Sequence, residues 1–257
     1  MSLKVESLTV AYGANRIIQD LSATLPSGQL AVLIGPNGSG KSTLLKGLAG
    51  LLSCHGSVSL AGQVLPPEQR RKEVAYMPQD IGAVSALTIL EVVLLGRLGR
   101  LGMRLPNDLL EAASAALEAF GLLPLATRRL NEVSGGQRQL VYLTQSLFRE
   151  PQVLLLDEPT AALDLRHQMI VLKGVSDYAH KQGKIVLIAM HDLSLAAQFA
   201  DTLLCLRDGR IEAAGKVEAV LTEARVEQLY GVEVAIRQSL PGRLVVVPLR
   251  ASSATPS

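Results

Sequence analysis

A short run of glycine, lysine and serine residues near the N-terminus has the residue types and the spacing to bind phosphate. Residues 35–42 match G-x-x-x-x-G-K-[ST], the pattern of a loop that wraps nucleotide phosphates. Glycines let such a backbone close around the phosphates and turn its N–H groups inward. In this pattern Lys41 reaches the outer phosphates and the hydroxyl of Ser42 holds Mg²⁺. The residues of the run are Gly35, Pro36, Asn37, Gly38, Ser39, Gly40, Lys41 and Ser42.

The segments on either side of this run support the interpretation. Residues 29–34 form an apolar run of strand length, and residues 43–48 have a helical pattern. The start of a helix adds unpaired N–H donors and the positive end of the helix dipole. A glycine-rich turn that matches by chance is the alternative, but it does not explain both flanks. The sequence therefore predicts a site for a nucleoside triphosphate.

Two adjacent carboxylates follow another apolar run. Residues 152–156 have strand character, and Asp157 and Glu158 come directly after them. An acid at the carboxyl end of a parallel strand lies in the crevice where ligands bind. We expect Asp157 to hold Mg²⁺, directly or through water, and Glu158 to polarise the attacking water. Acids also follow strands at ordinary turns, but the phosphate loop upstream favours the functional interpretation.

A histidine and a glutamine end two further apolar runs. His191 follows residues 184–190, and Gln79 follows residues 74–78. A lone histidine is more often structural than catalytic, but this one ends a strand of the same predicted sheet. We expect His191 to meet a γ-phosphate, and Gln79 to contact Mg²⁺ or water and to signal its occupancy to the following segment.

The segment Ser134-Gly135-Gly136-Gln137 is a second candidate anion site. Ser134 is a good helix N-cap, and a helix is predicted from there to about Glu150. The glycines expose backbone N–H groups at the start of this helix. A capped helix without a ligand is the alternative. In a chain that already has a phosphate loop, we expect this segment to bind the phosphate held by a second copy of the protein.

Composition narrows the setting. The chain has 257 residues, enough for one large or two small domains, and its 25 Lys and Arg against 23 Asp and Glu give a net charge of +2. This balance and the absence of Trp argue against a nucleic-acid partner. No signal peptide and no stretch of about 18 apolar residues is visible, so we expect a soluble cytosolic domain.

The apolar runs predict an α/β fold. Residues 3–10, 17–25 and 58–65 have the pattern of a small antiparallel sheet. Helical patterns lie between most of the remaining strands, as a parallel sheet requires. The stretch 84–150 interrupts this alternation and is largely helical, and Asp208-Gly209 predicts a hairpin turn. The predicted parallel strands are 29–34, 74–77, 153–156, 185–190 and 202–206.

Together these motifs resemble the ATP-binding subunit of an ABC transporter over at least residues 3–225. The resemblance implies the P-loop NTPase fold of an ABC ATPase, with a mainly parallel core sheet, a small antiparallel β subdomain and an inserted helical subdomain at about 84–150. It implies a single domain over 1–257, with a C-terminal extension at about 226–257.

The resemblance also assigns roles to the motif residues. It implies that Tyr12 stacks on adenine, that the phosphate loop runs to Thr43, and that Gln79 senses a membrane partner. Residues 134–137 become the signature of the family, residues 162–164, which end in Asp164, its dimer-facing loop, and His191 its switch histidine. Two copies would lie head to tail with two ATP molecules between loop and signature, closing on ATP and reopening on hydrolysis.

A narrower likeness concerns two segments. Residues 87–97 and 226–234 resemble importers of iron-siderophores, haem and cobalamin. The resemblance implies an integral membrane permease dimer, a periplasmic or surface solute-binding protein, and a peripheral position on the cytoplasmic face of the inner membrane. The segment after Gln79 would receive a permease helix, and its leucines, Leu94 and Leu95 among them, are expected to be exposed for docking.

Some positions depart from the family pattern. Val133 replaces the commoner leucine, Leu140 stands where a basic residue is usual, and residues 144–146 read Thr-Gln-Ser in place of Ala-Arg-Ala. None of them maps to a phosphate contact, so we expect them to alter surface contacts of the helix rather than ATP binding.

Three alternatives remain open. The ATPase could serve another transporter class, such as a metal-ion system or an exporter. A soluble ABC ATPase acting on nucleic acid or ribosomes usually has two ATPase halves, a coiled coil or a basic linker, and these are absent from the sequence. A binding module that never hydrolyses its nucleotide would not need both Glu158 and His191. The sequence does not identify the cargo.

Overall fold

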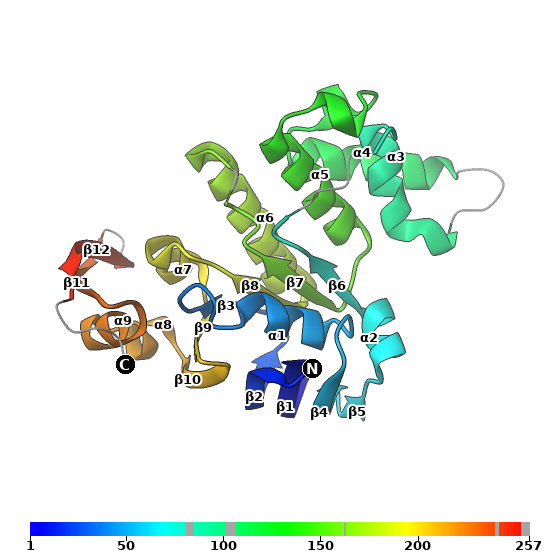
Figure 1. Cartoon of the computed structure of the whole chain (residues 1–257). Coiled ribbons are helices and arrows are strands. Elements are labelled where there is room, and N and C mark those ends of the chain that lie inside the picture. Colours follow the sequence, from blue (N-terminus) through cyan, green and yellow to red (C-terminus); the bar gives the residue numbers. More distant parts are fainter. Residues whose placement is uncertain (81–84, 101–105, 162, 240–241, 253–257) are drawn as a thin grey trace.

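The computed structural model describes residues 1–80, 85–100, 106–161, 163–239 and 242–252 (Figure 1). Its central element is a six-stranded sheet in the order β10-β9-β3-β8-β7-β6. Five of these strands run parallel, as predicted, and β10 (Arg210–Gly215) pairs antiparallel with β9. The parallel strands are β3 (Gln29–Ile34), β6 (Val74–Met77), β7 (Val153–Asp157), β8 (Ile185–Ala189) and β9 (Thr202–Arg207).

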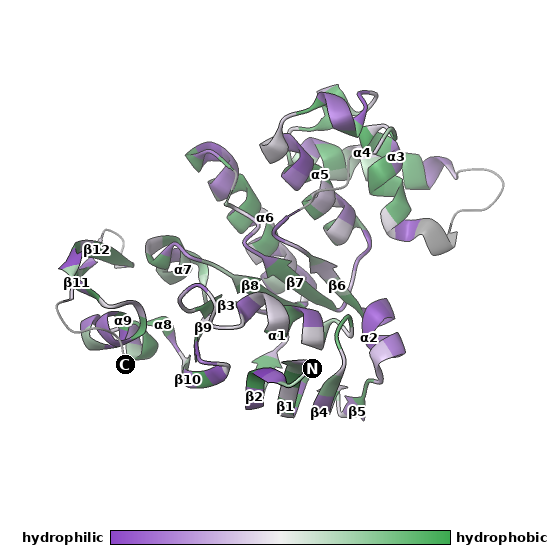
Figure 2. Ribbon diagram, viewed as in Figure 1, coloured by the Kyte–Doolittle hydropathy of each residue, from purple (hydrophilic) through white to green (hydrophobic). Residues whose placement is uncertain are grey.

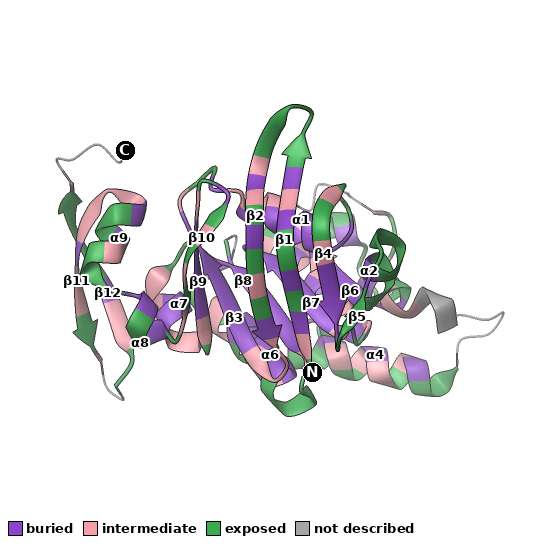
Figure 3. Ribbon diagram, turned by 90° about the horizontal axis from the view of Figure 1, so that it is seen from below, coloured by how far each residue is buried: buried purple, intermediate pink, exposed green. Residues whose placement is uncertain are grey.

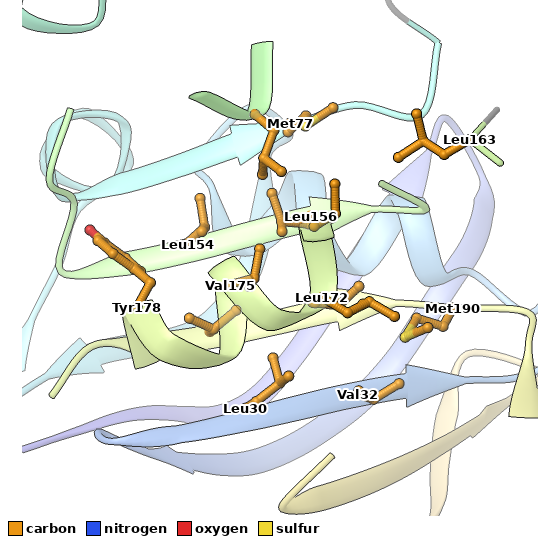
Figure 4. Close-up of a cluster of buried hydrophobic side chains, with 14 of the residues drawn as sticks. Leu30, Val32, Met77, Leu154, Leu156, Leu163, Leu172, Val175, Tyr178 and Met190 are labelled. Carbon is orange, nitrogen blue, oxygen red and sulfur yellow. The ribbon is translucent and has the colours of Figure 1, made fainter. Parts of the chain in front are cut away.

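The parallel strands are buried on both faces, because each face packs against another layer. Leu30 and Val32 point to the side of α6 (Leu165–Gln182), where they join Leu172 and Val175 in one core (Figure 4). The alternate residues of β3 point to the side of α1 (Lys41–Leu48) and join a second core. These strands are accordingly hydrophobic along most of their length, whereas the exposed helix α2 (Pro67–Glu73) is hydrophilic (Figure 2).

A four-stranded antiparallel sheet covers the second core. Its order is β2-β1-β4-β5, and buried and exposed residues alternate along β1 and β2 (Figure 3). The strands are β1 (Ser2–Tyr12), β2 (Asn15–Pro26), β4 (Cys54–Leu60) and β5 (Gln63–Val64). Tyr12 ends β1 and pairs with Asn15, so the turn itself is formed by Gly13 and Ala14.

Helices fill the chain between β6 and β7, and they lie at one end of the molecule (Figure 1). They are α3 (Ile89–Leu94), η1 (Leu95–Arg100), α4 (Asn107–Ala119), η2 (Leu123–Leu125), η3 (Leu130–Glu132) and α5 (Gly135–Phe148). Among the described residues, no helix has both the length and the apolar character needed to cross a bilayer.

The C-terminal part of the chain lies at the opposite end (Figure 1). A two-stranded antiparallel sheet forms there, and Ser194 of α7 contacts it through a hydrogen bond from Val246 N–H to its Oγ at 3.1 Å. The elements are α7 (Leu193–Phe199), α8 (Val217–Val220), α9 (Glu223–Tyr230), β11 (Val232–Gln238) and β12 (Leu244–Ala251).

Two expectations about exposure were wrong. Leu140 and Thr144 are 2% and 0% exposed, so these departures from the family pattern lie in the core and not on the helix surface. The buried Thr144 hydroxyl has a hydrogen-bond partner, because it donates to the Leu140 carbonyl at 2.8 Å. Leu94 is also buried, at 4%, whereas Leu95 is 39% exposed. Leu95 lies one turn after the exposed Glu91 on the same face of α3, whereas Leu94 lies on the side that packs inward, so the two leucines differ in exposure.

The predicted Asp208-Gly209 turn connects β9 to β10 and also supports the phosphate loop. Both residues have positive φ, 47° and 73°, as a two-residue hairpin turn requires. The Gly209 N–H donates to the Ser39 carbonyl at 3.2 Å, and the Gly209 carbonyl accepts from Gln19 N–H at 3.0 Å. A Cβ at position 209 would lie 1.9 Å from the Ile17 carbonyl oxygen.

We therefore expect Gly209→Ala to destabilise the fold more than a substitution that changes backbone strain alone. Gly183 has φ of 63°, and a Cβ at this position would meet no atom of the described residues within 4 Å, so Gly183→Ala is the matched control. The control should lower the free energy of unfolding by about 1 kcal/mol, because alanine disfavours the left-handed conformation. Gly209→Ala should lower the free energy of unfolding by roughly 1–3 kcal/mol more than the control, because the backbone must shift to make room for the Cβ. Urea unfolding measures both, and equal losses would contradict the prediction.

Candidate nucleotide site

The carboxyl ends of β3, β6, β7 and β8 meet at one edge of the sheet, next to a cleft of about 520 Å³. The cleft is lined by residues of the phosphate loop and by Tyr12, Gln79, Glu158 and His191. The structure therefore brings together residues that are far apart in the sequence but were predicted to act together. Tyr12 is 51% exposed.

The phosphate loop has its shape because the backbone approaches its neighbours closely. A Cβ at Gly35 would lie 2.2 Å from the Leu206 carbonyl oxygen, so only glycine fits where β3 passes β9. Gly40 has φ of 103°, and a Cβ there would lie 2.9 Å from the Ile18 side chain. α1 begins at Lys41, directly after the loop, so its first N–H groups face the cleft.

Lys41 is buried beneath this loop, with 6% of its surface exposed. Its Nζ donates to the Gly35 carbonyl at 2.7 Å and to the Pro36 carbonyl at 3.1 Å. Burial lowers the pKa of Lys41, and the nearby carboxylates of Glu158 and Asp157 partly offset this shift. The ammonium is thus held at the loop by backbone oxygens and faces two acids.

Asp157 is the last residue of β7 and is 2% exposed. Its Oδ2 accepts a hydrogen bond from the Tyr76 hydroxyl at 3.2 Å, while Oδ1 has no hydrogen-bond partner among the described residues. Burial and the negative charge of Asp157 raise the pKa of Tyr76, so the phenol stays protonated and donates. One carboxylate oxygen is therefore fixed and the other is available for a ligand.

Glu158 is held from two sides. Its Oε2 accepts from Gln79 Nε2 at 2.6 Å, and its Oε1 forms an ion-pair contact with His191 Nε2. The side chain of Glu158 is 9% exposed, whereas that of His191 is 43% exposed. The carboxylate thus lies between the ends of β6 and β8, within the cleft.

The donor set fits a magnesium ion. Mg²⁺ prefers oxygen ligands and keeps several of them from water and phosphate. The Ser42 hydroxyl, the Gln79 amide oxygen and the unpaired Oδ1 of Asp157 are all oxygen donors at this edge. Among the described residues there is no group of three acidic, His or Cys side chains that could hold a metal by themselves.

The residues 134–137 do not line this cleft. Ser134 caps α5, because its Oγ accepts from Gln137 N–H at 3.2 Å and its own N–H donates to Gln137 Oε1 at 3.0 Å. Gly135 and Gly136 form the first helical turn, and the N-terminus of α5 is largely exposed.

Asp164 likewise lies outside the cleft. It caps α6 by accepting from His167 N–H at 2.9 Å, and this hydrogen bond holds the pKa of the Asp164 carboxyl below its usual range. Leu163 is buried at 9%, and position 162 of the predicted dimer-facing loop lies outside the described residues.

Two residues of the site were missed in the sequence. Tyr76 contacts Asp157, and Gln139 donates from Nε2 to the Glu158 carbonyl at 3.1 Å. Tyr76 lies on β6 only three residues before Gln79, so the strand pattern placed it near the acids. No feature of the sequence around Gln139 indicated a role in the site, because glutamine is common in helices.

These features define a nucleoside-triphosphate-binding protein of the phosphate-loop class, and comparisons with known proteins narrow it further. The family model described as ABC transporter matches residues 18–161. The siderophore transport ATP-binding protein YusV of Bacillus subtilis is 36% identical over 243 residues, covering 92% of this chain and 88% of the relative. The hemin import ATP-binding protein HmuV of Myxococcus xanthus is 38% identical over 264 residues, covering 98% of each.

A solved structure shows the same arrangement. It is an inward-facing conformation of a metal-chelate type ABC transporter, with a TM-score of 0.83 and 30% identity, covering 96% of this chain and 97% of that one. The chain belongs to the ABC transporter family, as one of its ATP-binding, ATP-hydrolysing subunits. The predicted fold class is thereby confirmed.

The position of Lys41 generates a test of the phosphate loop. We expect Lys41→Ala to weaken ATP binding by about 10- to 100-fold, because a charge-assisted contact to phosphate is lost. Lys46→Ala removes the same side chain from the last turn of the same helix and should leave ATP affinity unchanged. Calorimetry measures both, and equal affinities for the two variants would contradict the role of Lys41.

Proposed function

We propose that this chain hydrolyses ATP to drive uptake of a metal chelate, of the iron-siderophore, haem or cobalamin type, through a membrane permease. The names of the siderophore and hemin relatives and of the metal-chelate transporter support the cargo class. Residues 87–97 and 226–234 resemble importers of iron-siderophores, haem and cobalamin. This resemblance supports the same cargo class and adds cobalamin to it. An ATPase subunit does not contact its cargo, so the proposed site acts on ATP alone.

The placement of Glu158 is the single observation that carries the proposed reaction. Its carboxylate lies in the cleft beside the phosphate loop, held by Gln79 and His191. In this position Glu158 would accept a proton from the water that attacks the terminal phosphate. Lys41 and the His191 imidazole would face the outer phosphate oxygens, where negative charge develops.

The proposed metal would be held by Ser42, Gln79 and Asp157. When bound, Mg²⁺ supplies positive charge between the outer phosphates and so lowers the cost of the developing charge. The fixed Oδ2 of Asp157 leaves its Oδ1 for this role, directly or through water. Tyr12, at the rim of the cleft, would stack on the adenine ring.

We further propose that two copies lie head to tail with ATP between them. The exposed N-terminus of α5 is outside its own cleft, and helix geometry leaves the N–H groups of Gly135 and Gly136 without intrahelical partners, which suits a phosphate on the facing copy. Residues of the loop around Asp164 would lie between the two sites. Each site would then need both copies, so ATP closes the dimer and hydrolysis opens it.

The Glu158→Gln variant tests the reaction and the dimer together. We expect it to bind ATP normally and to hydrolyse it about 10²- to 10⁴-fold more slowly, because the amide cannot accept the proton. It should therefore accumulate as a dimer with ATP, seen by light scattering. Turnover near that of the wild type would remove Glu158 from its proposed role.

The composite site is tested by adding Ser134→Arg to Glu158→Gln. The arginine would occupy the space of the facing phosphate, so ATP should still bind but the dimer should not form. If ATP drives the double variant into dimers as readily as Glu158→Gln alone, the sandwich arrangement is wrong.

The proposed permease contact lies after β6, among the helices at one end of the molecule. A hollow of about 400 Å³ is lined by Leu95, Gly96 and Arg149, among others, and Leu95 is 39% exposed beside it. An apolar permease helix could bury Leu95 there. Such a contact would hold the subunit at the cytoplasmic face of the inner membrane as a peripheral protein, in indirect contact with a periplasmic or surface solute-binding protein.

We expect Leu95→Asp to weaken association with the permease by about 100-fold or more, because a carboxylate would be buried without a partner. Leu123→Asp is the matched control, since Leu123 is 37% exposed and lies among the same helices. ATP affinity should stay unchanged in both variants. Co-purification with a co-expressed candidate permease measures the contact, and equal recovery of both variants would show that docking occurs elsewhere.

A further inference from the structure

A single helix connects two functional regions of the chain. The N-terminus of α5 carries Ser134, the residue proposed to face the partner's ATP, and Gln139 is the fifth residue of the same helix. At 1.5 Å per residue, the two positions are about 7.5 Å apart along the helix axis. A hydrogen-bonded helix of this length moves as a unit, so a displacement at Ser134 reaches Gln139.

Gln139 contacts the catalytic end of β7. Gln139 is 5% exposed, and its Nε2 donates to the Glu158 carbonyl at 3.1 Å. The Glu158 N–H donates to the Ala189 carbonyl at 3.1 Å, so both polar groups of this backbone unit are held. Glu158 also has φ of 52°, a left-handed conformation that costs energy in a residue with a side chain.

This conformation makes the position of the Glu158 carboxylate sensitive to the hydrogen bond from Gln139. A strained backbone persists only where its surroundings hold it. The Glu158 carbonyl also accepts from Ala161 N–H at 3.2 Å, so Gln139 is one of its two donors and the one that ties it to α5. If α5 shifts and the bond from Gln139 lengthens, this peptide loses its link to α5, and the Glu158 side chain moves relative to Gln79 and His191. The bond therefore links the position of α5 to the state of the carboxylate.

The amide of Gln139 is a poor stabiliser of the fold. Its Oε1 is buried without a hydrogen-bond partner among the described residues. A buried polar atom without a partner costs stability, and an apolar side chain of the same length would avoid that cost. The hydrogen bond to the Glu158 carbonyl is thus the contact by which this amide can contribute to function.

We propose that Gln139 couples the two ATP sites of the dimer, because it joins the helix that faces the partner's nucleotide to the backbone of Glu158 in its own site. Gln139 is a positioning residue, since it acts through Glu158 and touches no reacting atom. The inference rests on the sandwich dimer proposed above. Binding of ATP to the partner draws the N-terminus of α5 into place and thereby fixes Glu158 for hydrolysis in the same subunit.

The test compares two glutamines of the same helix. Gln139→Met keeps the length of the side chain but cannot donate to Glu158. Gln145→Met is the matched control, because Gln145 Nε2 donates to the Val92 carbonyl at 2.8 Å and so joins α5 only to a neighbouring helix. The purified full-length subunit is assayed for the ATP dependence of hydrolysis, ATP affinity and melting temperature.

We expect Gln139→Met to lower kcat about fivefold and to reduce the Hill coefficient from above 1 in the wild type toward 1. ATP affinity should not change, and the melting temperature should stay equal or rise, because an unpaired buried atom is removed. Gln145→Met should leave kcat and the Hill coefficient as in the wild type. If Gln139→Met does not fold, Gln139→Asn withdraws the amide by one methylene and should show the same changes.

Three results would overturn the proposal. They are an unchanged Hill coefficient in Gln139→Met, an equal loss in both methionine variants, or a wild type that hydrolyses ATP without cooperativity. The proposed function fails separately, if Glu158→Gln still hydrolyses ATP or if no ATP-dependent dimer forms.

Discussion

Two adjacent carboxylates are buried at the end of β7, and the arrangement of the site follows from this constraint. Asp157 and Glu158 are 2% and 8% exposed, and a buried charge is tolerated only when it is paired or hydrogen-bonded. Lys41 faces both acids, Tyr76 donates to the first, and Gln79 donates to the second. The groups that make the buried acids tolerable are therefore also the groups that we propose to bind the nucleotide and its metal.

The phosphate loop depends on parts of the chain that its own motif does not contain. The backbone of Gly35 packs against the Leu206 carbonyl, and the Ser39 carbonyl accepts from Gly209 N–H at 3.2 Å. The ABC transporter model matches residues 18–161, whereas both of these contacts, and His191, come from later segments. The shape of the phosphate loop thus depends on β9 and on the turn after it. The motif alone is therefore not sufficient to form the site.

The sequence was informative where structure follows from local pattern and less so where it follows from distant contacts. The parallel strands, the phosphate loop and the acids could be predicted, because apolar runs bounded by glycine or acid determine them. The burial of Leu140 could not, because it depends on which elements pack against α5, whereas the helical spacing from Glu91 favours Leu95 over Leu94 for the exposed face and was not used. Tyr76 was missed because its partner lies 81 residues away, and Gln139 because its partner lies 19 residues away.

In the proposed importer, two of the hydrogen bonds that Glu158 accepts come from segments with different proposed partners. Gln79 donates to its carboxylate and leads into the segment proposed to meet the permease, while Gln139 donates to its carbonyl from the helix proposed to meet the partner's ATP. His191 also contacts the carboxylate, and Ala161 N–H also donates to the carbonyl, but only Gln79 and Gln139 tie Glu158 to these two segments, so we propose that loss of either bond shifts the carboxylate. Hydrolysis would then require both a docked permease and a closed dimer, which prevents ATP from being consumed without transport.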